Sequence, residues 1–523
     1  MKFKELEEST INQARDIYKN KELSWDERMK ILTNLFGQSE RTCRKWCVKL
    51  GFKERPENIG TAECDQYKEA QKRVIDTGKK YYLISWAQNN TPVLKPFLEN
   101  MKAYASFLNA EILIIAGRYK NPTSVFSDAK EDFWCDDVLP YLTANVHHLN
   151  SNLKVCGNIK ISPTTKNPLL GMSGLSDGES CVFGHPRVHL EPMPTLSGHK
   201  LLLTTGACTK ENYTDSKVGY IGEFNHTMGF TIVEIKDDRI FFTRQVTADS
   251  KNGNFIDLYY KITNGKITRS ENAECLVYGD IHVGQHNPHV ISQTKSLLLD
   301  KLKIKTLVFH DIFDGYSISH HHEKNPFILA KKEFENTNSL SNEIEEMLNW
   351  LSDFEKHDGD VVIVRSNHDL FIEKYLNGDW KMNLKNSKEY MKYAAAILNN
   401  EIGSSGIVGY IISQKYPKFK CLGLNDSYVI KGDWEVGQHG FLGSNGSRPN
   451  LTTFRNLPNK TITGHTHTPR RLDGAISCGT STHLRLDYNE GGPSSWVNCH
   501  VLTNSDGRSQ QIIFINGEFT TFE

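Results

Sequence analysis

Five short motifs with metal-binding side chains follow one another through the second half of the chain. Each motif follows or interrupts an apolar run typical of a buried strand. Their aspartate, asparagine and histidine side chains offer oxygen and imidazole ligands without a cysteine nearby, a set that suits Mn²⁺, Mg²⁺, Fe or Zn and disfavours a structural thiolate zinc site. Together they predict a two-metal hydrolytic centre. The motifs are Asp280-Ile281-His282, His310-Asp311 with Asp314, Asn367-His368-Asp369, Gln438-His439-Gly440 and Gly464-His465-Thr466-His467.

The elements that must position these motifs alternate between strands and helices from residue 272 to the end. In open α/β sheets, functional groups collect at the carboxyl ends of strands because the following loops converge there. We therefore expect one cluster in space, in which a carboxylate such as Asp311 bridges two cations about 3.5–4 Å apart that activate water for phosphoryl displacement. The expected strands are 275–279, 306–309, 361–364, 434–436 and 460–463, and the expected helices include 327–354 and 387–399.

The order of these motifs resembles the calcineurin-like metallophosphoesterase superfamily over about half of the chain. The resemblance implies a β-sandwich flanked by helices and two divalent cations, Mn²⁺ in first place with Mg²⁺ as the alternative. His368 would act as general acid or transition-state stabiliser, and Asp369 would orient it. His310 and Ser366 stand where the family usually has glycine, which bears on loop geometry and metal preference. By the same resemblance one cation would be held by Asp280, His282, Asp311 and His467, and the other by Asp311, Asn367, His439 and His465.

Two sequence features bear on the substrate. Protein phosphatases of this superfamily usually carry Arg-Gly after the second aspartate and Glu after Asn-His, whereas this chain has Gly315-Tyr316 and Asp369. That difference favours the nuclease and phosphodiesterase branches, and the layout resembles recombination-repair nucleases and phage-encoded early proteins that degrade host DNA. Phosphates near the metals would be gripped by Arg448, Arg470 and Arg471. The alternative for the last two is that they are solvated or paired with Asp473.

Residues 1–56 are predicted to form a small helical module. One helix is expected from Glu5 to Tyr18, a second ends at Gly37, and a third begins after Ser39 and reaches Leu50. Helix, turn and basic helix resemble a helix-turn-helix DNA reader, with an accessory or oligomerisation module as the alternative. The predicted DNA-binding residues are Arg41, Arg44, Lys45 and Lys49.

Residues 57–79 are expected to form a linker and a helix, and residues 80–270 a mixed α/β domain of unknown role, before a catalytic domain over 271–523. Strands at 81–86 and 111–117 around a helix at 94–108 suggest a parallel βαβ unit. Further short strands are expected at 200–204, 229–235, 239–244 and 257–262. Gly184-His185 and His189 offer ligands, but scattered histidines are more often structural. The sequence shows no convincing internal repeat.

Composition limits the function classes. The 523 residues carry 62 Lys+Arg and 62 Asp+Glu, so a DNA-binding surface must be local. No secretory signal or membrane span is predicted, and eleven cysteines without a CxxC pair indicate reduced thiols in the cytoplasm, that of the host if the protein is phage-encoded.

We expect a metal-dependent DNA nuclease that forms a homo-oligomer, with the N-terminal or middle region open to a protein partner. Two alternatives stay open. One is a metallophosphatase or phosphodiesterase acting on a small molecule or a phosphoprotein. The other is a non-catalytic DNA-binding regulator on a phosphoesterase scaffold.

Overall fold

The computed structural model describes residues 3, 6–20, 23, 25–50, 52, 64–126, 131–196, 198–486 and 489–522. The chain divides into two compact units, Met1–Asp65 and Gln66–Glu523. Among the described residues, no helix combines the length and the apolar character that crossing a membrane requires.

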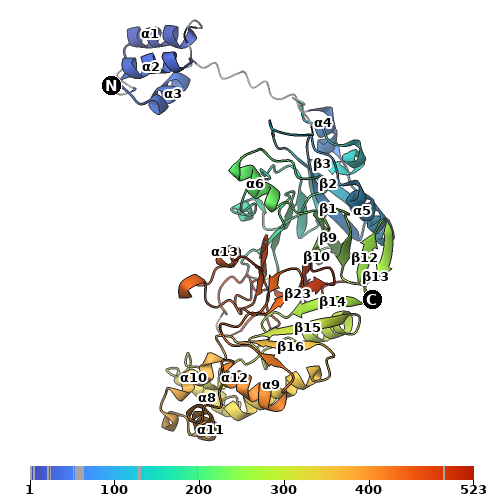
Figure 1. The fold of residues 1–523 in the computed structure, drawn as a ribbon, viewed down its shortest axis with the longest axis vertical. Helices are drawn as coiled ribbons and strands as arrows, with labels where there is room; N and C mark the ends of the chain where they lie inside the picture. The colour runs from blue at the N-terminus through green and yellow to red at the C-terminus, as the bar shows by residue number, and fades with distance from the viewer. Residues whose placement is uncertain are drawn as a thin grey trace. The chain divides into compact units, whose positions relative to one another are not determined.

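The first unit is a bundle of the three expected helices, α1 (Glu8–Lys19), α2 (Trp25–Phe36) and α3 (Glu40–Lys49) (Figure 1). Gly37 ends α2 with a φ of +59°, a left-handed conformation that glycine adopts without steric cost. The apolar faces of the helices meet in one core, formed by Ala14, Met29, Leu32, Phe36, Cys43, Trp46, Cys47 and Phe52.

The second unit is a mixed α/β structure built on four sheets. A six-stranded sheet has the order β17-β16-β15-β14-β23-β24 and a five-stranded sheet the order β10-β9-β1-β2-β3. A ten-stranded sheet runs β18-β19-β20-β22-β21-β7-β8-β6-β5-β4, and β11-β12-β13 form a small separate sheet. The strands are β1 (Tyr81–Gln88), β2 (Glu111–Gly117), β3 (Leu142–Thr143), β4 (Val146–Asn150), β5 (Leu153–Cys156), β6 (Ser180–Phe183), β7 (His189–Pro192), β8 (Leu201–Thr204), β9 (Gly229–Ile235), β10 (Phe241–Thr247), β11 (Phe255–Asp257), β12 (Tyr260–Thr263), β13 (Lys266–Arg269), β14 (Asn272–Val277), β15 (Lys303–His310), β16 (Asp360–Val364), β17 (Lys420–Cys421), β18 (Val429–Ile430), β19 (Trp434–Glu435), β20 (Lys460–Thr463), β21 (Arg470–Leu472), β22 (Ala475–Ser477), β23 (Asn498–Asn504) and β24 (Ser509–Phe514).

Helices cover the sheets from outside. The free face of the six-stranded sheet packs against helices that contribute Val290, Met347, Ile372 and Ile412 to the largest apolar core. The helices of this unit are α4 (Asp65–Lys72), α5 (Lys95–Leu108), α6 (Lys217–Phe224), α7 (Pro288–Thr294), α8 (Pro326–Phe334), α9 (Leu340–Leu351), α10 (Leu370–Leu376), α11 (Ser387–Leu398), α12 (Gly406–Lys415) and α13 (Leu451–Phe454).

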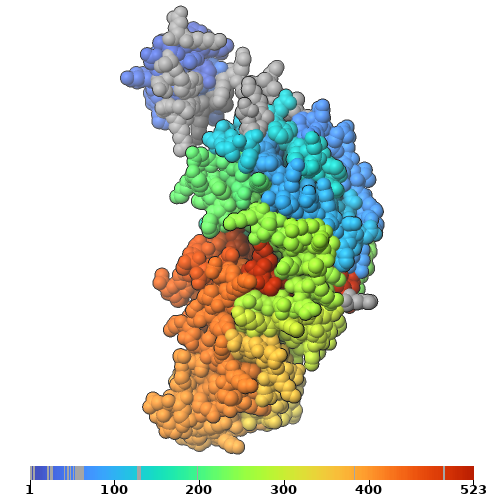
Figure 2. Space-filling view, turned by 45° about the vertical axis from the view of Figure 1, so that its right-hand side comes forward, coloured from blue at the N-terminus to red at the C-terminus, as the bar shows by residue number. Residues whose placement is uncertain are grey.

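The ten-stranded sheet is shared between two sandwiches. One half packs face to face on the six-stranded sheet, where Val277 and Val308 meet Ile462 and Ile476. The other half packs on the five-stranded sheet through a second core that includes Ile84, Leu113, Val155 and Leu203. The C-terminal hairpin, red in Figure 2, lies between the lime-green and orange parts of the chain.

The two sandwiches repeat one topology. In each, a C-terminal hairpin (β9-β10 or β23-β24) lies antiparallel to the first strand of a parallel series (β1-β2-β3 or β14-β15-β16-β17). Their halves of the large sheet also match strand for strand, β4-β5-β6-β8-β7 against β18-β19-β20-β22-β21, and they meet where β7 pairs antiparallel with β21. The sequence shows no repeat because the same strand order tolerates different side chains.

This arrangement bears on the boundary expected after residue 270. The ten-stranded sheet takes strands from both sides of that residue, so the middle and C-terminal regions share one continuous sheet. Whether they fold separately stays a prediction that expression of the two halves can test.

Candidate metal centre

The five motifs converge at one edge of the second sandwich. Strands β14, β15 and β16 are parallel, so the loops that carry Asp280, Asp311 and Asn367 leave the same edge of their sheet. Strands β19 and β20 are also parallel, and the loops after them carry His439 and the Gly464–His467 turn. All seven predicted metal ligands, taken from positions 280 to 467, are linked by short contacts.

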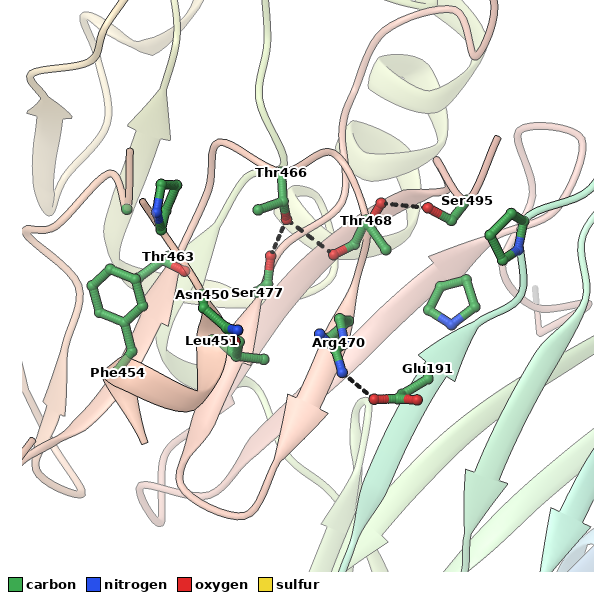
Figure 3. Close-up of a pocket in the computed structure, with 14 residues that line it drawn as sticks. Glu191, Asn450, Leu451, Phe454, Thr463, Thr466, Thr468, Arg470, Ser477 and Ser495 are labelled. Atoms are coloured by element: carbon green, nitrogen blue, oxygen red, sulfur yellow. Dashed lines mark hydrogen bonds and ion pairs between the residues drawn. The ribbon is translucent and has the colours of Figure 1, made fainter. Parts of the chain in front are cut away.

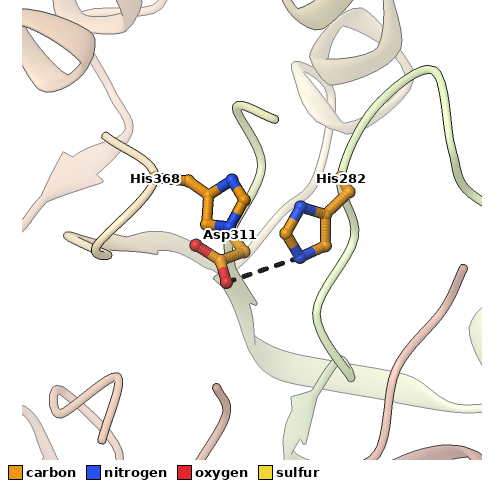
Figure 4. A group of neighbouring side chains, drawn as sticks. All are labelled: His282, Asp311 and His368. Atoms are coloured by element: carbon orange, nitrogen blue, oxygen red, sulfur yellow. Dashed lines mark ion pairs between the residues drawn. The ribbon is translucent and has the colours of Figure 1, made fainter. Parts of the chain in front are cut away.

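One set of contacts surrounds Asp311. Its Oδ2 lies 3.1 Å from His439 Nε2 and 3.5 Å from His282 Nε2. His467 Nε2 lies 3.2 Å from His282 Nε2 and 3.2 Å from Asp280 Oδ2. Potential ligand atoms therefore gather within 4.8 Å of one another in two groups, His282–Asp311–His368 (Figure 4) and Asp280–Asp311–His467, which share Asp311.

A second set of contacts surrounds Asn367. Its Oδ1 lies 3.0 Å from His439 Nε2 and 3.0 Å from His465 Nδ1. Because His439 also approaches Asp311, the two sets join through these residues. The seven predicted ligands thus lie together, and their division between two cations stays a prediction.

The backbone at this edge is strained. His282, Asp311, His465 and His467 all have positive φ, at 46°, 46°, 72° and 55°. Such conformations cost non-glycine residues of order 1–3 kcal/mol each and persist only where the surrounding structure holds them. Four of the seven ligand candidates thus have a left-handed backbone conformation at the point where their side chains converge.

Buried carboxylate oxygens at this point have no hydrogen-bond partner among the described residues. Asp280 Oδ1 and Asp311 Oδ1 belong to this class, and Asp280 Oδ2 has the 3.2 Å ion-pair contact with His467 Nε2. A buried unpaired charge is costly unless a counter-charge or a metal compensates it. Gly464 keeps this space open, since a Cβ there would come closer than 3.0 Å to Asp280 Oδ1. Oxygen donors and imidazoles around unpaired carboxylates fit divalent cations.

The electrostatics favour an anionic, imidazole-lined site. Burial acts to raise the pKa of Asp311, but His439, His368 and His282 outweigh it and hold that pKa well below its usual range. For His282, burial acts to lower the pKa. The charges of Asp311, Asp314 and Asp280 outweigh burial and raise this pKa to about 9. His465 is neutral, because burial lowers its pKa to about 4. A cation must therefore displace a proton from His282, so binding should strengthen as pH rises.

Asp314 holds two histidines of the site. Its carboxylate Oδ1 lies 2.8 Å from His282 Nδ1, and its backbone carbonyl accepts from His368 Nδ1 at 2.5 Å. These contacts direct Nε2 of each ring toward the centre. Asp369, expected to orient His368, instead accepts from Ser366 N at 2.9 Å. The sequence analysis included Asp314 in the second motif but assigned it no role. Its position three residues after Asp311 was the sequence feature that could have indicated one.

Ser366 and His310, which stand where the metallophosphoesterase motifs usually have glycine, are both buried. The Ser366 hydroxyl accepts from Asp369 N at 3.3 Å and so closes the loop around Asn367 and His368. His310 lies with its Nδ1 3.5 Å from His439 Nδ1, and its Nε2 has no hydrogen bond within the described chain. Burial lowers the pKa of His310 to about 4, so its ring adds no charge.

The predicted substrate-binding arginines differ in accessibility. Arg448 is exposed. Arg470 is partly exposed and forms an ion pair with Glu191. Arg471 is only 6% exposed and donates from Nη1 to Ser509 O at 3.2 Å, so the structure does not bring it to a substrate. Asp473 pairs with neither; it binds Arg187 and His189, each at 3.0 Å.

Other predicted residues lie away from this centre. His185 and His189 belong to the first sandwich and are buried in structural hydrogen bonds, with His185 Nε2 3.1 Å from Ser162 O. Lys49 is exposed on α3, and its Nζ lies 5.2 Å from the centre of the Phe3 ring. The side chains of Arg41, Arg44 and Lys45 lie outside the described part of the structure.

The chain is similar to Protein A1 of Escherichia phage T5. The two are 29% identical over 491 residues, which cover 89% of this chain and 86% of that protein. No family model matches the chain, and no solved structure does. The similarity points to a phage protein, and the name of that relative states no activity.

Proposed function

We propose that this protein is a metal-dependent phosphodiesterase that cleaves DNA, with a metallophosphoesterase sandwich as its catalytic part. The observation that carries the proposal is the convergence of seven metal-ligand candidates around buried carboxylate oxygens without partners. One cation would be held by Asp280, His282, Asp311 and His467, and a second by Asp311, Asn367, His439 and His465. The two packed sheets with outer helices support the sandwich assignment.

The protein residues prepare the site for an in-line displacement at phosphorus. Two divalent cations, when bound, would neutralise phosphate charge and make water more acidic. Asp314 fixes His368 through Nδ1, which leaves Nε2 as the nitrogen that can give a proton to the departing oxygen. Phe371 stacks on the His368 ring at a centroid distance of 4.7 Å and limits its rotation.

Several features favour DNA as the substrate. The Gly315-Tyr316 and Asp369 residues depart from the protein-phosphatase pattern, and Arg448 is exposed. The first unit includes α3, a helix with a basic sequence, which would add a phosphate-binding surface. Similarity to a phage protein fits an activity in the cytoplasm of an infected host.

A substrate panel with Mn²⁺ tests the proposal. The panel holds supercoiled plasmid, linear duplex DNA, a cyclic nucleotide and bis(4-nitrophenyl) phosphate, with Asp311→Ala as the matched inactive variant. We expect DNA cleavage that Asp311→Ala abolishes. If the small esters are cleaved and DNA is not, the protein is instead a small-molecule phosphodiesterase. If no substrate of the panel is cleaved, the protein is a non-catalytic regulator.

A further inference from the structure

A pocket of about 420 Å³ lies beside the metal centre, on the outer face of the ten-stranded sheet (Figure 3). Ile462 and Ile476 point into the sandwich core, so their neighbours Thr463 and Ser477 face outward along the strands. The pocket volume lies within the range typical of small-molecule sites.

The lining is neutral, rich in hydroxyl groups and flanked by apolar faces. Thr466 Oγ1 lies 2.7 Å from Ser477 Oγ, and Thr468 Oγ1 lies 2.9 Å from Ser495 Oγ. The Thr466 and Ser477 hydroxyls can also donate to the backbone carbonyls of Thr468 and Cys478, at 3.2 and 3.1 Å, so this pair keeps acceptor lone pairs for a ligand. Arg470, which also lines the pocket, forms an ion pair with Glu191 (Figure 3). Apolar walls come from Leu451, Phe454, Pro192, Pro194 and Pro449.

The first sandwich supplies an internal comparison. Strand β6 ends at Phe183 before Gly184-His185, as β20 ends at Thr463 before Gly464-His465. Phe183 packs with Leu169 and Leu202 in an apolar cluster that fills the outer face there. The fold therefore accepts apolar side chains at this position of the sheet. The hydroxyl-lined pocket of the second sandwich is not required for folding.

The pocket and the metal centre share their dividing wall. Thr466, which lines the pocket, stands between His465 and His467, and Gly440, which also lines it, directly follows His439. A phosphodiester held at the metal ligands would thus have its own or an adjacent nucleoside within reach of the pocket. A neutral planar ring with hydrogen-bonding edges suits hydroxyl groups set between apolar faces.

We propose that this pocket binds one nucleobase of the strand whose phosphate lies at the metal centre. The inference rests on the proposed function. Part of the wall, Glu191 to Pro194, comes from the first sandwich, at and just after β7, and the rest comes from the second. The first sandwich thereby contributes to substrate binding at the site of its counterpart.

Filling the pocket with an indole tests the proposal. Ser495→Trp and Pro194→Trp each place an indole at the wall where Ser494 pairs with Thr195, and Ser296→Trp, at an exposed position of the helical turn Lys295–Leu299, is the matched control. The measurement is kcat/KM with Mn²⁺ for a DNA oligonucleotide and for bis(4-nitrophenyl) phosphate, which carries no base. We expect both pocket variants to lower the ratio of DNA to small-diester cleavage at least about ten-fold, the loss expected from a binding contact near 1.4 kcal/mol. An unchanged ratio in both variants overturns the proposal.

An abasic scan gives an independent readout. Oligonucleotides with a single tetrahydrofuran residue at successive positions are cleaved by the wild-type protein and by Pro194→Trp. We expect one position near the cut to slow the wild type, with little further loss in Pro194→Trp because the pocket is already blocked. Equal cleavage at every position overturns the base pocket while leaving the nuclease assignment intact. If the wild type cleaves the small diester but no DNA, the nuclease assignment itself fails.

Discussion

Replacing Gly464 by alanine tests the metal centre where its ligands leave no room. The added Cβ would lie closer than 3.0 Å to Asp280 Oδ1 and 3.1 Å from His310 Cβ. The Asp280 carboxylate is fully buried, so it must retreat by more than about 0.4 Å to regain an ordinary contact of 3.4 Å. Metal–ligand distances tolerate only about 0.2 Å.

The variant should therefore bind Mn²⁺ at least about 10-fold more weakly, comparable to the loss of a residue that supports a ligand. Overpacking should also lower the free energy of unfolding by about 1–3 kcal/mol. Mn²⁺ content after dialysis and the midpoint of urea unfolding measure the two effects. Gly174→Ala is the matched control, since a Cβ there meets no atom within 4 Å. Mn²⁺ binding by Gly464→Ala with wild-type affinity would refute the assignment of Asp280 as a ligand.

Three further outcomes are expected. His368→Ala should lower turnover by about 10²–10⁴-fold with near-normal Mn²⁺ content, and wild-type DNA cleavage would remove His368 from the mechanism. Asp311→Ala should lose both cations, because Asp311 is proposed to bind both and its Oδ2 approaches His282 of one set and His439 of the other; full occupancy by metal analysis would contradict this. Arg244→Met should lower the free energy of unfolding at pH 7 by about 3–5 kcal/mol, since it strands the fully buried Asp257 that Arg244 Nε binds at 2.8 Å. Burial acts to raise the pKa of Asp257, but Arg244 leaves it lowered, so this stability is present above the unfolded pKa near 3.9 and is lost as pH falls through the folded value. The deficit of the variant in urea unfolding should therefore shrink below pH 4, and a constant deficit would contradict the linkage.

The local elements were predictable because their signals are local. Apolar runs marked strands β14, β15, β16 and β20, and Gly37 marked the end of α2. One expected helix, 327–354, is instead divided into α8 and α9, with Asn336 at a φ of 55° between them. The break falls on polar residues, Asn336, Asn338 and Ser339, and the Ser339 side chain caps α9, a local signal that the single expected helix did not use.

By itself the sequence determined which residues can bind metals and their order, since ligand chemistry belongs to each side chain and strand ends follow from local patterning. Only the tertiary structure decided that Asp314 holds His368, that Arg471 is buried, and that Glu191 reaches Arg470. It also decided that the middle region repeats the topology of the C-terminal one and shares its large sheet. These features depend on pairing between strands such as β7 and β21, about 280 residues apart, and no local spacing encodes which distant strands will meet.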